Sequence, residues 1–326
     1  AMERQTTTVD QRREEEKPRV GISSCLLGNN VRYDGGHQRD RFLTDTLGKY
    51  VEWVPVCPEV ECGLPTPRES MHLEGNAEAP RLVTSRTNRD VTERMESWMS
   101  DRLDELEKEG LCGFIFKIKS PSSGMRDIPV FGENGQQSTS RPGLFGGAFM
   151  ERFPLLPVED DGRLHDPGLR ENFIERIFAL KRYREARRTV SGLMEFHASH
   201  KLQIMAHSQE LLREMGQLAA RASEVPEDEL FPGYEKHLLK ALVEKSTPRQ
   251  NVNVLHHILG YFKEELVGWE KQELLETIES YRKGLIPLIV PVTIVQHYVR
   301  KYDKKYLRKQ TYLQPHPFEL KLRNHA

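Results

Sequence analysis

Short apolar runs alternate with a long amphipathic stretch in the first half of the chain. Mostly apolar runs at residues 19–23, 51–56 and 113–118 have the length of buried strands. Between the second and third runs, apolar residues recur at helical spacing over residues 90–109, with Asp90 as the predicted N-cap. Strands that alternate with helices in this way predict a parallel sheet with right-handed crossovers. The fold class expected for this half is therefore α/β, with a small, Rossmann-like parallel sheet.

Further elements are expected around this pattern. We expect a short helix over residues 39–50, a helix over residues 144–152 and a last short strand over residues 155–158. An acidic turn at residues 159–162 comes next, and we place the domain boundary directly after it.

The strand pattern almost disappears after residue 166. Apolar residues recur there at helical spacing, as in Phe173, Ile177 and Leu180. Clusters of Gly and Pro divide this half into about six helices. We therefore predict an α/β domain over residues 17–162 and an all-α helical bundle over residues 163–326. The polar residues 1–16 are expected to form a disordered arm.

Composition narrows the classes of protein that this pattern allows. The chain has 326 residues, of which 37% are hydrophobic and 30% charged, which is typical of a globular protein. Its net charge of −1 gives no overall attraction to nucleic acid or acidic membranes. No apolar run approaches the roughly 20 residues that a membrane-spanning helix needs, and the first residues do not resemble a signal peptide. We expect a cytoplasmic protein with a small-molecule partner and no membrane partner, and its oligomeric state is open.

The segments that follow the three predicted strands carry the candidate chemistry. Cys25 follows the first strand, the loop with Cys57, Glu59 and Cys62 follows the second, and Ser120 follows the third. Because the carboxyl ends of parallel strands meet at one edge of a sheet, we expect these segments to form one pocket.

The cysteines suit a metal better than a disulfide framework. Four cysteines in a chain of this length do not form such a framework, and we expect Cys112, inside an apolar run, to be buried. Thiolates on loops suit soft metal ions and iron–sulfur clusters, whereas the spacing here is poor for structural zinc. A cluster held by three cysteines would leave one iron open to a sulfur atom of the substrate. Glu59 could then act as a general base, and Ser120 could hold the substrate.

Several of these motifs together resemble the thiouracil desulfurase (TudS) family. They are the segments 25–28, 31–36, 57–59 with 67–68, and 120–124, and the resemblance covers about residues 17–160. The second half resembles the YbgA-type helical domain, through residues 150–157, 251–257 and 287–291.

The resemblance implies a 4Fe–4S cluster and the hydrolytic removal of sulfur from a thiolated uracil base, nucleoside or nucleotide. Cys25 matches the first ligand, and the second falls in the loop that holds Cys57 and Cys62, where we favour Cys62. The resemblance also implies that Glu59 is the acid/base carboxylate, and Ser120 matches a conserved serine of the family motif. Ser123 stands where the family has its third cysteine, and a hydroxyl replaces a thiolate on iron poorly. Three cases therefore stay open: Cys57 serves as the third ligand, the cluster is labile or absent, or Ser123 is an engineered change.

Two other functions stay open at the sequence level. The first is a non-enzymatic module that binds a nucleobase or nucleic acid without a cluster, and the alternating basic and aromatic residues 298–306 favour it. The second is a zinc-dependent hydrolase that uses Cys25, Cys57 and Cys62. The pair His197 and His200 shares a helix face, but we expect it to be structural because no ligand set surrounds it.

Overall fold

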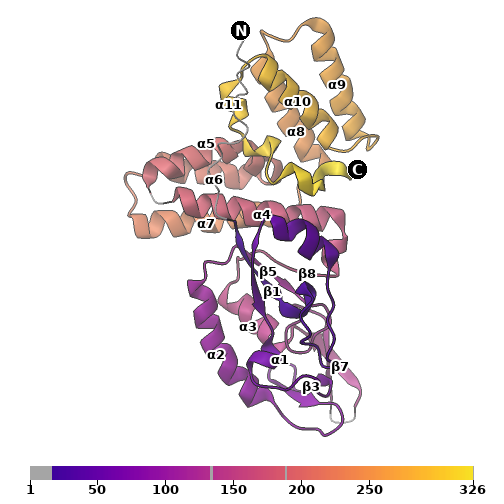
Figure 1. Cartoon of the computed structure of the whole chain (residues 1–326). Coiled ribbons are helices and arrows are strands. Elements are labelled where there is room, and N and C mark those ends of the chain that lie inside the picture. Colours follow the sequence, from indigo (N-terminus) through magenta and orange to yellow (C-terminus); the bar gives the residue numbers. More distant parts are fainter. Residues whose placement is uncertain (1–16, 133–134, 188, 326) are drawn as a thin grey trace, which may run out of the picture.

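The computed structural model describes residues 17–132, 135–187 and 189–325. An α/β region comes first, and helices occupy the chain from Pro167 onward (Figure 1). The predicted fold class is confirmed. The predicted arm over residues 1–16 lies outside the described residues.

The first sheet is parallel throughout, as the strand–helix alternation predicted. Its strands are β1 (Arg19–Ser23), β2 (Glu52–Val56), β5 (Gly113–Phe116) and β8 (Val158–Asp160), in the order β2-β1-β5-β8. Val20 of β1 lies opposite Trp53 on one side and Gly113 on the other. The residues of β5 are all buried, which is typical of a strand covered on both faces.

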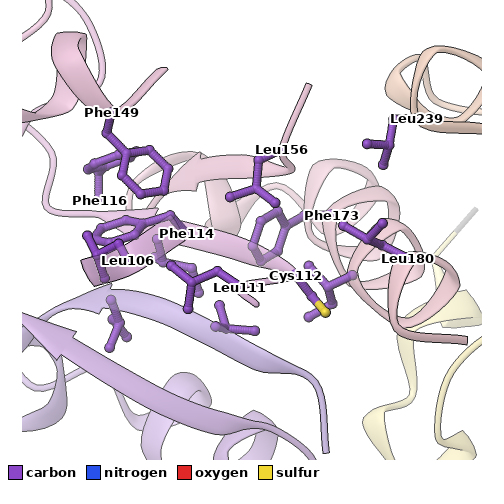
Figure 2. Packing of buried hydrophobic residues seen from close by; sticks show 14 of the residues in the cluster. Leu106, Leu111, Cys112, Phe114, Phe116, Phe149, Leu156, Phe173, Leu180 and Leu239 are labelled. Atoms are coloured by element: carbon purple, nitrogen blue, oxygen red, sulfur yellow. The ribbon is translucent and has the colours of Figure 1, made fainter. Parts of the chain in front are cut away.

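Helices α2 (Thr92–Lys108) and α3 (Leu144–Arg152) accompany this sheet. Asp90 accepts a hydrogen bond from the Thr92 backbone N–H at 2.9 Å, although the N-cap position itself is Val91. Phe149 of α3 packs its ring 4.7 Å from that of Phe114, centroid to centroid, and Figure 2 shows the two rings together with Phe116. Aromatic stacking therefore fixes α3 against the central strand β5.

A second sheet was not predicted from the sequence. It contains β3 (Met71–Gly75), β4 (Pro80–Thr84), β6 (Ile128–Phe131) and β7 (Gln137–Arg141), in the order β4-β3-β6-β7. Only the β3–β6 pair is parallel. The strands escaped prediction because β3 and β4 mix polar with apolar residues and β6 is a four-residue run that contains a proline. Four of the five residues of β7 are exposed.

Two local predictions differ from the structure. Residues 39–50 form a π-helical turn at Phe42–Thr46 and a 3₁₀ turn at Leu47–Lys49 instead of one α-helix. The last strand begins at Val158, because the expected segment 155–158 only leads into it.

The second half of the chain is helical. Its helices are α4 (Pro167–Ala186), α5 (Val190–His207), α6 (Gln209–Ala220), α7 (Glu227–Val243), α8 (Pro248–Leu259), α9 (Gly268–Arg282), α10 (Ile289–Lys301) and the short α11 (Lys305–Arg308). Side chains of Asp166, Thr189, Ser208 and Thr247 cap α4, α5, α6 and α8. No helix in the described parts of the chain is long and apolar enough to cross a membrane.

The hydrophobic core does not divide at the predicted boundary after residue 162. One cluster joins the first sheet to α4–α7, and a second cluster holds α8–α10 together. Figure 1 accordingly shows α4–α7 as a layer between the sheets and the remaining helices. Leu156 and Cys112 of the α/β region pack beside Phe173 and Leu180 of α4 (Figure 2). The boundary stays a prediction about sequence domains, since α4 shares its core with the sheet.

Candidate active site

The carboxyl ends of β1, β2 and β5 lie next to one another, because the three strands are parallel neighbours. Each end continues into a segment that lines one cavity of about 160 Å³. The first segment contains Cys25, the second Cys57 and Glu59, and the third Ser120 and Ser123. The structure thus brings together the three segments that the sequence singled out.

Glu59 is held in place by two other segments of the cavity wall. It lies in the first turn of α1 (Pro58–Glu61), which begins directly after β2. Its Oε2 accepts from Arg68 Nε at 2.7 Å, and Arg68 Nη2 donates to the same oxygen. Its Oε1 accepts from Ser122 Oγ at 2.7 Å. With 14% of the Glu59 side chain exposed and 6% of the Arg68 side chain, this ion pair is largely shielded from water.

Arg68 also fixes the loop that forms the opposite wall. Its Nη2 donates to the Val31 carbonyl at 2.8 Å, and its backbone N–H donates to the Tyr33 carbonyl at 2.8 Å. One guanidinium therefore joins Glu59 to the loop that carries Tyr33, and the Tyr33 ring stays exposed at the cavity.

A chain of hydroxyls leads from the cavity to Glu59. Ser122 Oγ donates to Glu59, so the 3.1 Å contact between Ser120 and Ser122 has Ser120 as its donor. Ser120 Oγ in turn accepts from the Ser123 backbone N–H at 3.2 Å. The arrangement can pass a proton from Ser120 through Ser122 to the carboxylate.

Both thiols at the cavity are protonated at neutral pH. Burial raises the pKa of Cys25 to about 11, although Lys117 acts in the opposite direction. Burial also raises the pKa of Cys57, and Glu59 adds to this effect. Without an ion to displace their protons, these groups are weak S–H donors and not thiolates.

The other two cysteines do not line the cavity. Cys62, favoured from the sequence as the second ligand, follows the turn of α1, and its Sγ donates to the Glu59 carbonyl at 3.3 Å. Cys57 faces the cavity instead, because it comes directly after β2. Cys112 is buried directly before β5, whereas Ser120 follows the other end of that strand. Figure 2 shows the Cys112 sulfur among the buried hydrophobic residues.

Lys117 and Asp161 are site residues that the sequence analysis missed. Lys117 Nζ forms an ion pair with Asp161 Oδ2 at 2.7 Å, and Asp161 Oδ1 accepts from the Ile118 backbone N–H at 2.7 Å. Lys117 lines the cavity, and Asp161 holds it there by joining the end of β5 to the end of β8. A lysine directly after one buried strand and an aspartate directly after another was the signal that could have identified it.

The donors around the cavity are two thiols and one hydroxyl. Cys25, Cys57 and Ser123 all line it, and Ser123 is buried. Among the described residues, no group of three or more His, Cys, Asp or Glu side chains is arranged to hold a metal ion. The zinc hydrolase with Cys25, Cys57 and Cys62 therefore lacks a formed ligand set, and its third cysteine lies off the cavity.

The basic and aromatic residues 298–306 serve contacts between helices. The Tyr298 hydroxyl donates to Glu273 at 2.9 Å, the Tyr302 hydroxyl donates to Glu270 at 2.6 Å, and Lys304 pairs with Glu265. These groups attach α10 and the turn after it to α9 and the residues before it. Three residues of this segment thus have partners within the chain, and nucleic-acid binding by the segment stays a prediction.

The two histidines on α5 also have partners within the bundle. His197 Nδ1 lies 2.9 Å from the Tyr234 hydroxyl, and His200 Nδ1 lies 2.9 Å from the Phe196 carbonyl. Burial lowers the pKa of both rings, which keeps them neutral at pH 7. They act as structural residues of the bundle.

Comparisons with known proteins divide the chain in the same order. Residues 20–161 match the family model described as 2-thiouracil desulfurase, and residues 201–317 match that of a protein family of unknown function, DUF1722. The uncharacterized protein YbgA of Escherichia coli (strain K12) is 33% identical over 153 residues, which are 46% of this chain and 90% of that protein. A solved structure described as the 4Fe–4S-dependent thiouracil desulfidase TudS is 30% identical, with a TM-score of 0.37. That match covers 46% of this chain and 95% of the solved chain.

Proposed function

The chain belongs to the family of the Escherichia coli protein YbgA and joins a domain of the 2-thiouracil desulfurase family to a YbgA-type helical domain, and on this premise we propose that its α/β domain removes sulfur from a thiolated pyrimidine. The match to the desulfurase model covers all three cavity segments. The single observation that carries the proposal is Glu59, a carboxylate held by Arg68 and Ser122 beside two thiols.

The cavity favours a small, single-ring substrate. Its volume of about 160 Å³ is below the roughly 300–1,000 Å³ of pockets for drug-sized ligands. Tyr33 offers an exposed ring at the cavity on which a pyrimidine can stack. A free base or the exposed base of a nucleoside or nucleotide therefore suits the site.

A 4Fe–4S cluster held by three cysteines does not fit this donor set. Cys25 and Cys57 supply soft sulfur at two positions, but the third donor on the wall is the hydroxyl of Ser123. Both thiols are also buried with raised pKa values, so ligation would first have to remove their protons. We therefore derive the reaction from the side chains of the chain alone.

The reaction that these side chains support is a hydrolysis. Water attacks the carbon of the thiocarbonyl group, and the proton of the water passes to Glu59, directly or through Ser120 and Ser122. The S–H groups of Cys25 and Cys57 can donate to the sulfur as its negative charge develops. The sulfur takes the proton of the water back from Glu59, and the carbon–sulfur bond breaks as the remaining hydroxyl oxygen forms the carbonyl. The hydroxyl proton passes to the departing hydrosulfide through Glu59, so that sulfur leaves as hydrogen sulfide. The thiolated base and one water thus become the oxo base and hydrogen sulfide, with no net oxidation.

The test measures sulfide release from 2-thiouracil and 4-thiouracil by the full-length chain, together with the loss of thiocarbonyl absorbance. Glu59→Gln should lower the rate at least about a hundredfold, the range in which general bases contribute. Glu96→Gln, an exposed position on α2, is the matched control and should leave the rate unchanged. Absence of sulfide with either base, or equal rates for the two variants, would contradict the proposal.

Binding without turnover is the second candidate function, and the hydroxyl of Ser123 is the observation that favours it. In that case thiouracil binds to the chain, and Glu59→Gln weakens binding, but no sulfide appears. Anaerobic iron–sulfur reconstitution of the natural chain and of Ser123→Cys then tests whether the serine at position 123 prevents cluster binding. Ser123→Cys should gain iron and labile sulfide. If this variant then also releases sulfide from thiouracil, the natural chain is a relative of the desulfurases that binds the base without turnover.

A further inference from the structure

A second cavity lies in the helical half, away from the candidate active site. It has a volume of about 610 Å³, within the range of small-molecule sites. The beginnings of α4 and α8, the end of α9 and the last residues of the described chain form its walls. In Figure 1 the carboxyl terminus accordingly lies close to α4.

Charged side chains are buried in the wall of this cavity. Arg323 donates from Nε to Glu171 Oε1 at 3.1 Å, and His325 Nε2 lies 2.8 Å from Glu171 Oε2. Deeper in, His207 Nε2 lies 3.3 Å from Glu175 Oε1. Burying charges costs free energy that ion pairs often do not repay, so such a network beside a cavity indicates a binding role.

Two basic side chains of the wall, Arg323 and Lys245, have N–H donors that could still bind a ligand. Arg323 is only 6% exposed, and within the described part of the chain its Nη2 has no hydrogen-bond partner, since Nε and Nη1 donate to Glu171 and to the Tyr312 carbonyl. Lys245 is in no ion pair among the described residues, although the pKa of the nearby Asp166 carboxyl group, which lines the same cavity, is lowered by the Leu169 backbone N–H and also by the charge of Lys245. A methyl group on Gly168 would lie 3.3 Å from Lys245 Nζ, which places this ammonium group at the beginning of α4. Arg282 and Lys283 at the end of α9 also line the cavity, but both pair with Glu279, so Arg323 and Lys245 carry the argument for an anion.

We propose that this cavity binds a phosphate monoester on an organic body of about nucleotide size. The guanidinium of Arg323 would contact the phosphate through Nη2, and the ammonium of Lys245 would contact it as a point charge. The positive ends of the α4 and α8 dipoles face the same space, since Pro167 and Pro248 line it. Tyr281, Ile286 and Leu288 provide apolar wall for the organic part. A metal ion suits the site less, because among the described residues no cluster has the arrangement of metal ligands.

The experiment measures binding to the full-length chain by isothermal titration calorimetry with four probes. They are adenosine monophosphate, adenosine, inorganic phosphate and succinate. Adenosine monophosphate should bind tightest, phosphate more weakly, and adenosine and succinate at least about tenfold more weakly than the nucleotide. Adenosine or succinate binding as tightly as the nucleotide would overturn the assignment to phosphate, and no detectable binding of the nucleotide at millimolar concentration would overturn the site.

Charge-reversal variants locate the binding. Lys245→Glu should weaken nucleotide binding at least about tenfold. Lys240→Glu, an exposed position on α7 without an ion pair in the described structure, is the matched control and should bind as the natural chain does. Glu59→Gln should also keep full affinity, which separates this site from the cavity of the α/β domain. Equal affinities for the two lysine variants, with circular dichroism showing both folded, would refute the location.

Discussion

At the residue scale, the cavity of the α/β domain depends on the pair of Glu59 and Arg68. Sequence reasoning placed Glu59, Cys25 and Ser120 in the segments of the site, because each follows a recognisable strand. It gave Arg68 no role and preferred Cys62 to Cys57, because spacing along a loop does not show which side chain turns toward the sheet edge. The Ser122 contact with Glu59 joins residues 63 positions apart, which only the folded chain reveals.

Replacing Arg68 should strongly lower the free energy of unfolding. Arg68→Met leaves the Glu59 carboxylate buried without its cation, and removing one partner of a buried pair typically costs about 3–5 kcal/mol of unfolding free energy. Urea denaturation measures this cost. The control is Arg86→Met, whose side chain is 84% exposed in its pair with Glu69 and should change stability by no more than about 0.5 kcal/mol. If the loss comes from the unpaired carboxylate, Glu59→Gln in the Arg68→Met background restores part of it, and a further loss would argue against this cause.

The buried pair of His207 and Glu175 should make stability depend on pH. Burial lowers the pKa of His207, but Glu175 outweighs burial and the net pKa is raised from 6.5, while the pKa of Glu175 is lowered from 4.5 despite its own burial. The contribution of His207 is therefore complete below pH 6.5 and is lost as the pH rises through the raised value, whereas that of Glu175 is present above pH 4.5 and is lost as the pH falls.

The quantity to measure is the difference in unfolding free energy between the natural chain and His207→Gln. It should be largest between pH 4.5 and 6.5 and should shrink toward alkaline pH. Taking the difference between the two chains removes the contributions of other groups, such as the neutral His197 and His200. A difference that grows as the pH rises from 6.5 would show that His207 is neutral in the folded protein.

At the element scale, the sequence predicted the strands of the first sheet and the long helices well, and the strands of the second sheet poorly. β1, β2 and β5 are mostly apolar runs, and α2 repeats its apolar positions at helical spacing, so local pattern alone identified them. The strands of the second sheet are short and mostly mix polar with apolar residues, and they are defined by backbone pairing across long separations, such as Leu73 with Val130. No local pattern records such a pairing.

The contact between β5 and α4 depends on a glycine. A methyl group at Gly113 would lie 2.8 Å from Ile177 Cγ2 and 2.9 Å from the Pro157 carbonyl oxygen. Gly113→Ala should therefore destabilise the chain by about 1–3 kcal/mol, the usual cost of overpacking, in urea denaturation. Gly268→Ala, where a methyl group meets nothing within 4 Å, is the control and should leave stability unchanged or slightly raised. Equal effects at the two positions would show that β5 and α4 can move apart without loss of stability.

At the scale of the whole molecule, two sequence families meet in one hydrophobic core. The desulfurase match ends at residue 161 and the second match begins at residue 201, yet α4 between them packs on the sheet through Phe173 and Ile177. Sequence reasoning found the change from strands to helices. It could not find the shared core, because an apolar helix face looks the same whichever neighbour covers it.

The contact of Gly113 with α4 also limits which α/β domains could replace this one in a chimeric protein. β5 runs from Gly113, under the helical layer, to the serine loop that holds Glu59, so the strand that rests on α4 is also the strand that carries the reactive end. A chimera joined where the two family matches adjoin would lose the packing of α4 on β5, the strand that positions the serine loop of the candidate active site. Another α/β domain should replace this one on the helices only if its central strand has a residue as small as glycine at the position of Gly113, where Ile177 of α4 packs.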